Sequence, residues 1–297
     1  MSLVSSTWRY RSLLGTSQHP IQRIAQKRLQ SLLNGRVHYE SYASLHPSLD
    51  SASPESGLYG NAAGTGTSPS RLESTLIAIS EALERWALFA NLREVGRDFE
   101  RLGFDTVPSS IGMAAFPGNA ARATQSALHE ARERWLVSTW WNGGGGIRVC
   151  RRSPAVDSFF LACPWPETQV CLSRTVWNSE TGEKCYGFGA SHSMDGAETS
   201  ALRELERNVR ALRKGANALS KLTSIERRLL WCSGTAGNSG VQDRIDVSLG
   251  KPAPSCPELI VDSEVVGPWT RWTTVWRCLY PMPSNAIDPG ITAHLLF

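Results

Sequence analysis

Two segments far apart in the chain, residues 68–86 and 187–208, each combine nearby glycines with a helix that carries carboxylates on its polar side. Between them, residues 135–186 read as short strands, interrupted by the glycine run 142–146 and by Pro-Trp-Pro at 164–166. Apolar runs bounded by glycine and proline are typical of antiparallel strands joined by turns. The order helix, loop, helices, strands, helix, strand therefore predicts an α+β fold with a mainly antiparallel sheet.

The first of these helices has a readable start and two faces. Ser68 suits the N-cap, and Pro69 suits the first helical position. Helical spacing predicts an apolar stripe of Leu72, Leu76, Ile79, Leu83 and Trp86. The opposite face then holds Ser70, Ser74, Ile77, Glu81, Glu84 and Arg85. Spacing alone favours a solvated face on which Glu81 and Arg85 form an i,i+4 ion pair.

The second helix opens with an acidic variant of the capping box, Asp195 to Glu198, and Lys214-Gly215 is a reasonable end. Its apolar face is expected to hold Leu202, Leu205, Val209 and Leu212. The other face holds Ala197, Ser200, Glu204, Arg207, Asn208 and Ala211. Small residues around one glutamate and one arginine indicate that something bulky packs near this face, although a plain surface helix satisfies the same spacing.

The remaining segments are expected to support these two helices. Residues 20–34 read as a basic amphipathic helix closed by Gly35, and residues 44–70 as a loop. A helix is expected over 118–136, where His129, Glu130 and Glu133 fit a solvated face better than a functional one. The segment 135–141, WLVSTWW, is taken as the first strand. Further predictions are a helix at 220–232, a loop to about residue 257 and a final strand in 269–281.

Composition places the chain among ordinary globular proteins. A formal net charge of +4 over 297 residues is far from that of a dedicated nucleic-acid binder, but it would help to attract a polyanion such as ATP. The seven cysteines form no CxxC pair, so neither a zinc site nor a disulfide framework is expected. No signal-like or membrane-spanning apolar run occurs. We therefore expect a cytoplasmic protein with no nucleic-acid or membrane partner.

Residues 80–86, Ser-Glu-Ala-Leu-Glu-Arg-Trp, resemble a helix of the YcaO family, in which Ser-x-x-x-Glu-x-x-Glu-Arg follows a glycine–lysine–glycine turn. Glu81, Glu84 and Arg85 match, whereas Ile77 stands at the serine position and the turn at 64–66 has no lysine. A second family signature resembles residues 187–204, with Gly187-Phe188-Gly189-Ala190, then His192 and Asp195, then Ala201-Leu202-Arg203-Glu204. Arg207 replaces the family's glutamine. The resemblance covers residues 58–213.

This resemblance implies a YcaO-like domain over residues 58–297, preceded by a helical or loop segment at 1–57. It implies ATP and Mg²⁺ as cofactors, with Glu81, Glu84 and Glu204 as Mg²⁺ ligands and Arg85 and Arg207 as phosphate contacts. Members of the family phosphorylate a backbone amide oxygen of a peptide, and cyclodehydratases form thiazoline or oxazoline rings in this way. His192 is a candidate for the catalytic base, which the sequence does not otherwise identify.

The resemblance also implies partners and leaves alternatives open. A ribosomal precursor peptide, a separate leader-peptide-binding protein and a flavin-dependent dehydrogenase are expected, and a homodimer is a further option. The partner interface would lie in the tryptophan-rich residues 135–177 or in the proline-rich residues 252–267. One alternative is thioamide or amidine formation on the same activated amide. Another is a non-catalytic scaffold, which Ile77 and the missing lysine favour.

Overall fold

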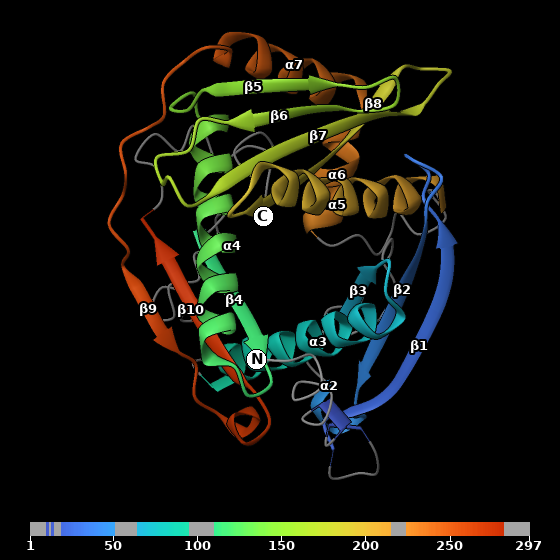
Figure 1. Cartoon of the computed structure of the whole chain (residues 1–297), viewed down its shortest axis with the longest axis vertical. Helices are drawn as coiled ribbons and strands as arrows, with labels where there is room; N and C mark the ends of the chain where they lie inside the picture. The colour runs from blue at the N-terminus through green and yellow to red at the C-terminus, as the bar shows by residue number, and fades with distance from the viewer. Residues whose placement is uncertain are drawn as a thin grey trace.

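The computed structural model describes residues 10–11, 13–14, 19–50, 64–94, 110–214 and 224–281. Three antiparallel sheets and several helices form the molecule (Figure 1). The first sheet has the order β1-β2-β3, with β1 at Ile21–Gln30, β2 at Val37–Leu45 and β3 at Gly64–Ser68. The second has the order β4-β10-β9, from Ser110–Phe116, Thr274–Tyr280 and Val261–Glu264. The expected α+β class is confirmed.

The third sheet is a meander of four strands in the order β5-β6-β7-β8. Its strands span Ile147–Arg152, Asp157–Leu161, Gln169–Asn178 and Glu183–Ser191. They lie where the alternation of apolar runs and turns predicted strands. Helix α5, Met194–Lys214, packs across β7 and β8.

Residues 20–34 are not a helix as expected. They form β1 and the start of a turn, and β1 pairs antiparallel with β2 from Ile21↔Leu45 to Gln30↔Val37. Gly35 has a φ of 69°, a conformation that suits glycine in a tight turn. On the face toward α3 (Arg71–Glu94), the Gln26 amide donates to Ser41 and to the Arg71 carbonyl. These cross-strand and strand–helix contacts outweigh the local helical spacing.

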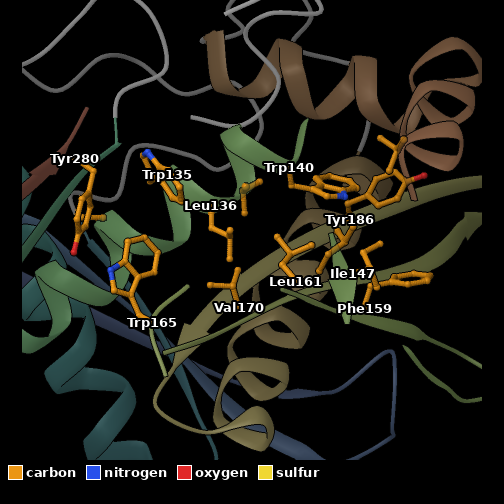
Figure 2. Close-up of a cluster of buried hydrophobic side chains, with 14 of the residues drawn as sticks. Trp135, Leu136, Trp140, Ile147, Phe159, Leu161, Trp165, Val170, Tyr186 and Tyr280 are labelled. Atoms are coloured by element: carbon orange, nitrogen blue, oxygen red, sulfur yellow. The ribbon is translucent and has the colours of Figure 1, made fainter. Parts of the chain in front are cut away.

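The segment 135–141 forms the last turns of α4, Ala120–Trp141, instead of a strand. Trp135, Leu136 and Trp140 enter the main core together with side chains from β5, β6, β7, β8 and β10 (Figure 2). Val137, Ser138 and Thr139 are buried as well, so this end of the helix is enclosed on all sides. A segment with no exposed face lacks the one-sided periodicity that separates helix from strand.

Burial limits what one proposed partner surface can offer. Within residues 135–177, Trp135, Trp140 and Trp165 lie in the core, whereas Trp141 and Trp177 are partly exposed. The proline-rich segment 252–267, which includes β9, is largely exposed, with Ile260 and Val266 among its exposed aliphatic residues. It remains a candidate surface.

Two α-helices follow α5 in the described chain. The first, α6, spans Ser224–Ser233 and matches the predicted short helix. The second, α7 at Thr235–Ser248, was expected to be part of a loop. Gly237, Val241 and Ile245 form its buried side at a spacing of four residues, although glycine and polar residues give the segment low helix propensity. A short helix, η3, precedes β10 at Pro268–Arg271.

The starts of the two site helices differ from those expected. Helix α3 begins at Arg71, and Ser68 ends β3 with a buried hydroxyl that accepts from the Ser70 amide at 3.1 Å. In α5, the Ser193 hydroxyl accepts from the Gly196 amide at 3.2 Å. Asp195 and Glu198, expected to form a capping box, instead pair with Arg151 at 2.9 and 2.7 Å.

Candidate functional site

Three strand–helix units of the same construction surround the candidate site. The first unit is β3–α3, the second is β4–α4 and the third is β8–α5, and in each the helix packs on its own strand. Each strand has a glycine against the helix backbone, where a β-carbon would collide with a carbonyl oxygen. The distances would be 2.1 Å from Ala78 for Gly64, 1.9 Å from Ala127 for Gly112 and 2.5 Å from Ala201 for Gly187. Strand and helix can approach this closely only because the glycine has no side chain.

A glutamate on each helix is tied to the strand at the residue after that glycine. Glu81 accepts from the Thr65 amide at 2.8 Å and from its hydroxyl at 3.0 Å. Glu130 accepts from the Met113 amide at 2.8 Å, and Glu204 accepts from the Phe188 amide. The three glutamates therefore occupy equivalent positions, and the three units can be aligned residue by residue.

This alignment reveals a repeat in the sequence. Residues 81–86 read Glu-Ala-Leu-Glu-Arg-Trp and residues 130–135 read Glu-Ala-Arg-Glu-Arg-Trp. Glu84 of α3 thus corresponds to Glu133 of α4, and the equivalent position in α5 is Arg207. The near-identity of the two hexapeptides could have identified Glu130 and Glu133 as site candidates from the sequence.

Helix α4 contributes the site residues that sequence reasoning missed. Glu133 accepts a hydrogen bond from the Ala190 amide of β8 and lies within electrostatic range of Glu130 and Glu204. Glu84 lies within electrostatic range of Glu130 and Glu81. The solvated face expected for α4 is therefore wrong for Glu133. Figure 1 shows α3 and α5 both approaching α4.

The carboxyl groups of this cluster have raised pKa values, so they are weaker acids than ordinary glutamates. Burial, followed by the Glu204 and Glu130 charges, raises the pKa of Glu133 to about 8. Burial and the charges of Glu130 and Glu81 raise the pKa of Glu84 well above its ordinary value. Burial also raises the pKa of Glu204, against the lowering effect of Arg207. Desolvation and like charge make the ionised forms costly, so the cluster resists carrying its full negative charge.

Two of the expected residues form the surface ion pair that spacing favoured. Arg85 Nη2 lies 2.6 Å from Glu81 Oε1 in an i,i+4 pair on α3. The polar face also differs in part from the expected one, because Ser74 is buried against Ser41 of β2 and Leu72 is exposed.

Within the described residues, no three His, Cys, Asp or Glu side chains are close enough together to hold a metal ion.

The small residues of α5 face a neighbouring strand. Ala197 and Ala201 are buried, and the space beside them is filled by the backbone of β8 at Gly187 and Gly189. The bulky group expected near this face is therefore the protein's own strand, and it sets the position of Glu204.

His192 is exposed at the junction of β8 and α5. It lies within electrostatic range of His129 on α4, whose pKa is lowered by burial and then by Arg132 and His192. Arg132 itself is buried and donates to Thr168 at 2.7 Å and to Tyr280 at 3.3 Å. His129 lies one turn before Glu133 on α4, and His192 lies two residues after Ala190, whose amide donates to Glu133.

A surface hollow of about 270 Å³ lies away from these carboxylates. It is lined by Leu32, Leu33, Pro154, Ala155, Thr175, Val176, Val209 and Arg213. The lining includes none of the site residues, so we place the candidate site by its charge cluster and its repeat.

The described helices include none that is both long and apolar enough to cross a lipid bilayer. All seven cysteines are free thiols.

At the level of sequence, neither a protein-family model nor a curated protein matches the chain. At the level of structure, the chain is similar to a chain of the E. coli microcin synthetase McbBCD complex with pro-MccB17 bound. The two share 13% sequence identity and a TM-score of 0.53, over 86% of each chain. This likeness concerns the fold, and it confirms the fold expected from the two motifs. The chain therefore has a YcaO-like α+β fold, shared with a component of a microcin synthetase complex.

Proposed function

We propose that the chain is an ATP-dependent cyclodehydratase component that activates backbone amides of a ribosomal precursor peptide. The observation that carries this proposal is the carboxylate cluster built by three equivalent strand–helix units, on the fold of a microcin synthetase chain. Thioamide or amidine formation would need the same activated amide and is the alternative within this chemistry.

The cluster suits a divalent cation. Mg²⁺ prefers carboxylate oxygens, and bringing a cation among repelling carboxylates relieves the cost of their charge. Glu84, Glu133 and Glu204 are the carboxyls with raised pKa values, and Glu81 supplies a further one nearby. Because these groups do not meet at one point, binding a cation would require their side chains to close on it.

The same cluster is bordered by arginines. Arg85, Arg134 and Arg207 each lie within electrostatic range of a cluster carboxylate. A guanidinium binds phosphate oxygens with two parallel hydrogen bonds, so these residues would orient a triphosphate beside the metal. The site would position the reactants and neutralise the charge of the phosphates, the two contributions that dominate catalysis of phosphoryl transfer.

The chemistry proposed for this site begins with an amide oxygen, which is a very poor leaving group. ATP, when bound, would supply a phosphoryl group that turns this oxygen into a good one. The chain's own residues would hold the reacting peptide against the arginine-bordered cluster. His192, or His129 one turn before Glu133 on α4, would accept a proton from the attacking side chain of the peptide.

The proposal includes partners. The similar structure is a multi-protein complex with its precursor bound, so we propose a precursor peptide and a leader-peptide-binding protein as partners of this chain. A flavin-dependent dehydrogenase would act on the azoline product. No described feature assigns a dimer interface.

The test is nucleotide binding by the purified chain. Calorimetry with Mg²⁺ and a non-hydrolysable ATP analogue should show binding that falls by about tenfold or more in Glu84→Gln and Glu133→Gln. Glu264→Gln, at the exposed edge strand β9, is the control and should bind as the wild type does. Binding by neither the wild type nor the control would support the non-catalytic scaffold. Undiminished binding in both site variants would reject this site.

A further inference from the structure

The surface hollow lies apart from the carboxylate cluster, where the β1–β2 turn, the β5–β6 turn, β7 and the end of α5 come together. Its most buried lining residue is Val209, which belongs to a small apolar cluster with Leu205 and Leu212. Its rim carries Leu32 and Val176, which are 41% and 50% exposed. Its volume of about 270 Å³ is below the roughly 300–1,000 Å³ of small-molecule pockets, so it suits one apolar side chain of a larger ligand.

Hydrogen bonds hold the two turns that form the walls of the hollow. In the β1–β2 turn, the Leu32 amide donates to Glu206 of α5 at 3.0 Å. In the β5–β6 turn, the Ser153 amide donates to the Val156 carbonyl at 2.9 Å. Walls that are already fixed lose little conformational entropy when the hollow is filled.

Strand β7 extends past its neighbour β6 beside this hollow. Its pairing with β6 ends at Asp157↔Arg174, whereas its pairing with β8 continues to Asn178 (Figure 1). Among the described strands, residues 175–178 therefore have a partner on the β8 side only. They carry neither a charge nor a proline, which commonly protect an open edge from pairing. A bulge against β8 follows Val176, so this edge suits the addition of a short extended segment.

The polar groups of the hollow define the chemistry that it would bind. Among the eight described residues that line it, Arg213 is the only charged one. Thr175 already donates its hydroxyl to the Ala155 carbonyl at 2.6 Å. The Arg213 side chain is exposed and makes no ion pair or hydrogen bond with the described residues. An apolar hollow with one such guanidinium is complementary to an apolar side chain that has a carboxylate next to it.

We propose that this hollow is a docking site for an acidic peptide that lies along the open edge of β7. An aliphatic side chain of the peptide fills the space between Leu32 and Val176, and a neighbouring aspartate or glutamate pairs with Arg213. A short stretch of the peptide backbone adds to β7. This inference is independent of the proposed ATP-dependent function, because the hollow shares no residue with the carboxylate cluster.

The test is a titration of the whole chain, with isotope-labelled leucine and valine methyl groups, by the peptide acetyl-Gly-Thr-Leu-Glu-Thr-Gly-amide. The methyl signals of Leu32, Val176 and Val209 should shift and saturate with a Kd of roughly 0.1–1 mM. Alanine in place of the peptide's leucine should weaken binding about tenfold, because the anchor side chain is lost. Glutamine in place of its glutamate should weaken binding about threefold.

Variants of two exposed lining residues locate the peptide. Arg213→Gln should weaken binding of the glutamate peptide about threefold and leave binding of the glutamine peptide unchanged. Val176→Asp should weaken binding about tenfold, because its carboxylate would repel that of the peptide. Val247→Asp is the matched control: this valine is 53% exposed on α7, outside the hollow, and the variant should keep a Kd within about twofold of wild type.

Several results would overturn the inference. One is equal affinity for the leucine and alanine peptides, and another is equal affinity of Arg213→Gln and wild type for the glutamate peptide. A third is the absence of saturable shifts at Leu32, Val176 and Val209 up to about 5 mM peptide. Sedimentation tests a competing occupant: self-association of the chain that Val176→Asp removes and Val247→Asp retains would assign the hollow to a second copy, and the peptide site would be wrong.

Discussion

Glu133 has surroundings unlike those of an ordinary surface glutamate. It sits where the second and third units meet, within electrostatic range of Glu130 on its own helix and Glu204 on α5, and it accepts from the Ala190 amide. Its position in the sequence gives no hint of this burial, because charge runs on helices are usually solvated. The repeat with residues 81–86 is the local signal for its role.

The acidity of Glu133 predicts how stability depends on pH. Its pKa is raised from 4.5 to about 8 in the folded protein, so folding favours the protonated form. This contribution is complete below about pH 4.5 and is lost as the pH rises through about 8. In metal-free buffer, the Tm of the wild type should fall between pH 5 and 9, and that of Glu133→Gln should fall less. Thermal melts across this range, with Glu264→Gln following the wild type, check the prediction; parallel curves for Glu133→Gln would contradict it.

At the scale of elements, the close approach of strand to helix is what aligns the glutamates. Gly112 of β4 faces the α4 backbone with no room for a methyl group, since a β-carbon would also lie 2.3 Å from the Ala131 nitrogen. The tie between Glu130 and the Met113 amide depends on this spacing. A change in the strand–helix distance would therefore be transmitted directly to the carboxylate cluster.

Gly112→Ala should lower the free energy of unfolding by about 1–3 kcal/mol, because the helix must move away from β4. Gly240→Ala is the control: its nearest neighbour would be the Trp141 ring at 3.7 Å, and it lies inside α7. Alanine there should be neutral or stabilise by up to about 1 kcal/mol. Urea unfolding of the two variants measures both effects. Equal stability of Gly112→Ala and wild type would show that the backbone yields without cost.

At the scale of the molecule, the sheets are connected on two sides. Helix α4 runs from the second sheet into the core of the third, and the β1–β2 hairpin reaches α5 (Figure 1). Glu206 of α5 makes this second connection, accepting from the Leu32 amide at 3.0 Å and from Arg210 at 2.6 Å. His38 of β2 lies 3.8 Å from the same oxygen. One buried carboxylate thus joins the first sheet to the third unit of the site.

Removal of this carboxylate should loosen the connection. Glu206→Ala is expected to lower the free energy of unfolding by about 2–4 kcal/mol, because the Leu32 amide and Arg210 lose a buried partner. Hydrogen exchange at Leu32 should become faster. Glu198→Ala on the same helix removes an ion pair with the more exposed Arg151 and should cost about 1 kcal/mol or less. Similar losses in the two variants would contradict a special role for Glu206.

Much of the fold could be predicted from the sequence, because the relevant signals are local. The strands between residues 147 and 191 are marked by apolar runs and turns, and α4 and α5 by helical periodicity over several turns. The same signals failed where tertiary contacts prevailed. Residues 21–30 have helical spacing but pair with β2, and residues 135–140 are all buried, so they have no exposed face.

The sequence by itself determined which chemical groups each helix carries, including the glutamates and arginines within 81–85 and 204–207. Which of these groups share one site was decided by the tertiary structure alone. Periodicity describes the faces of one element, whereas the meeting of α3, α4 and α5 depends on how three strands pack against them. The glycines at those contacts allow the strand backbone to approach the helix backbone. This approach brings Glu130 and Glu133 of α4 between Glu84 and Glu204, which are more than a hundred positions apart in the sequence.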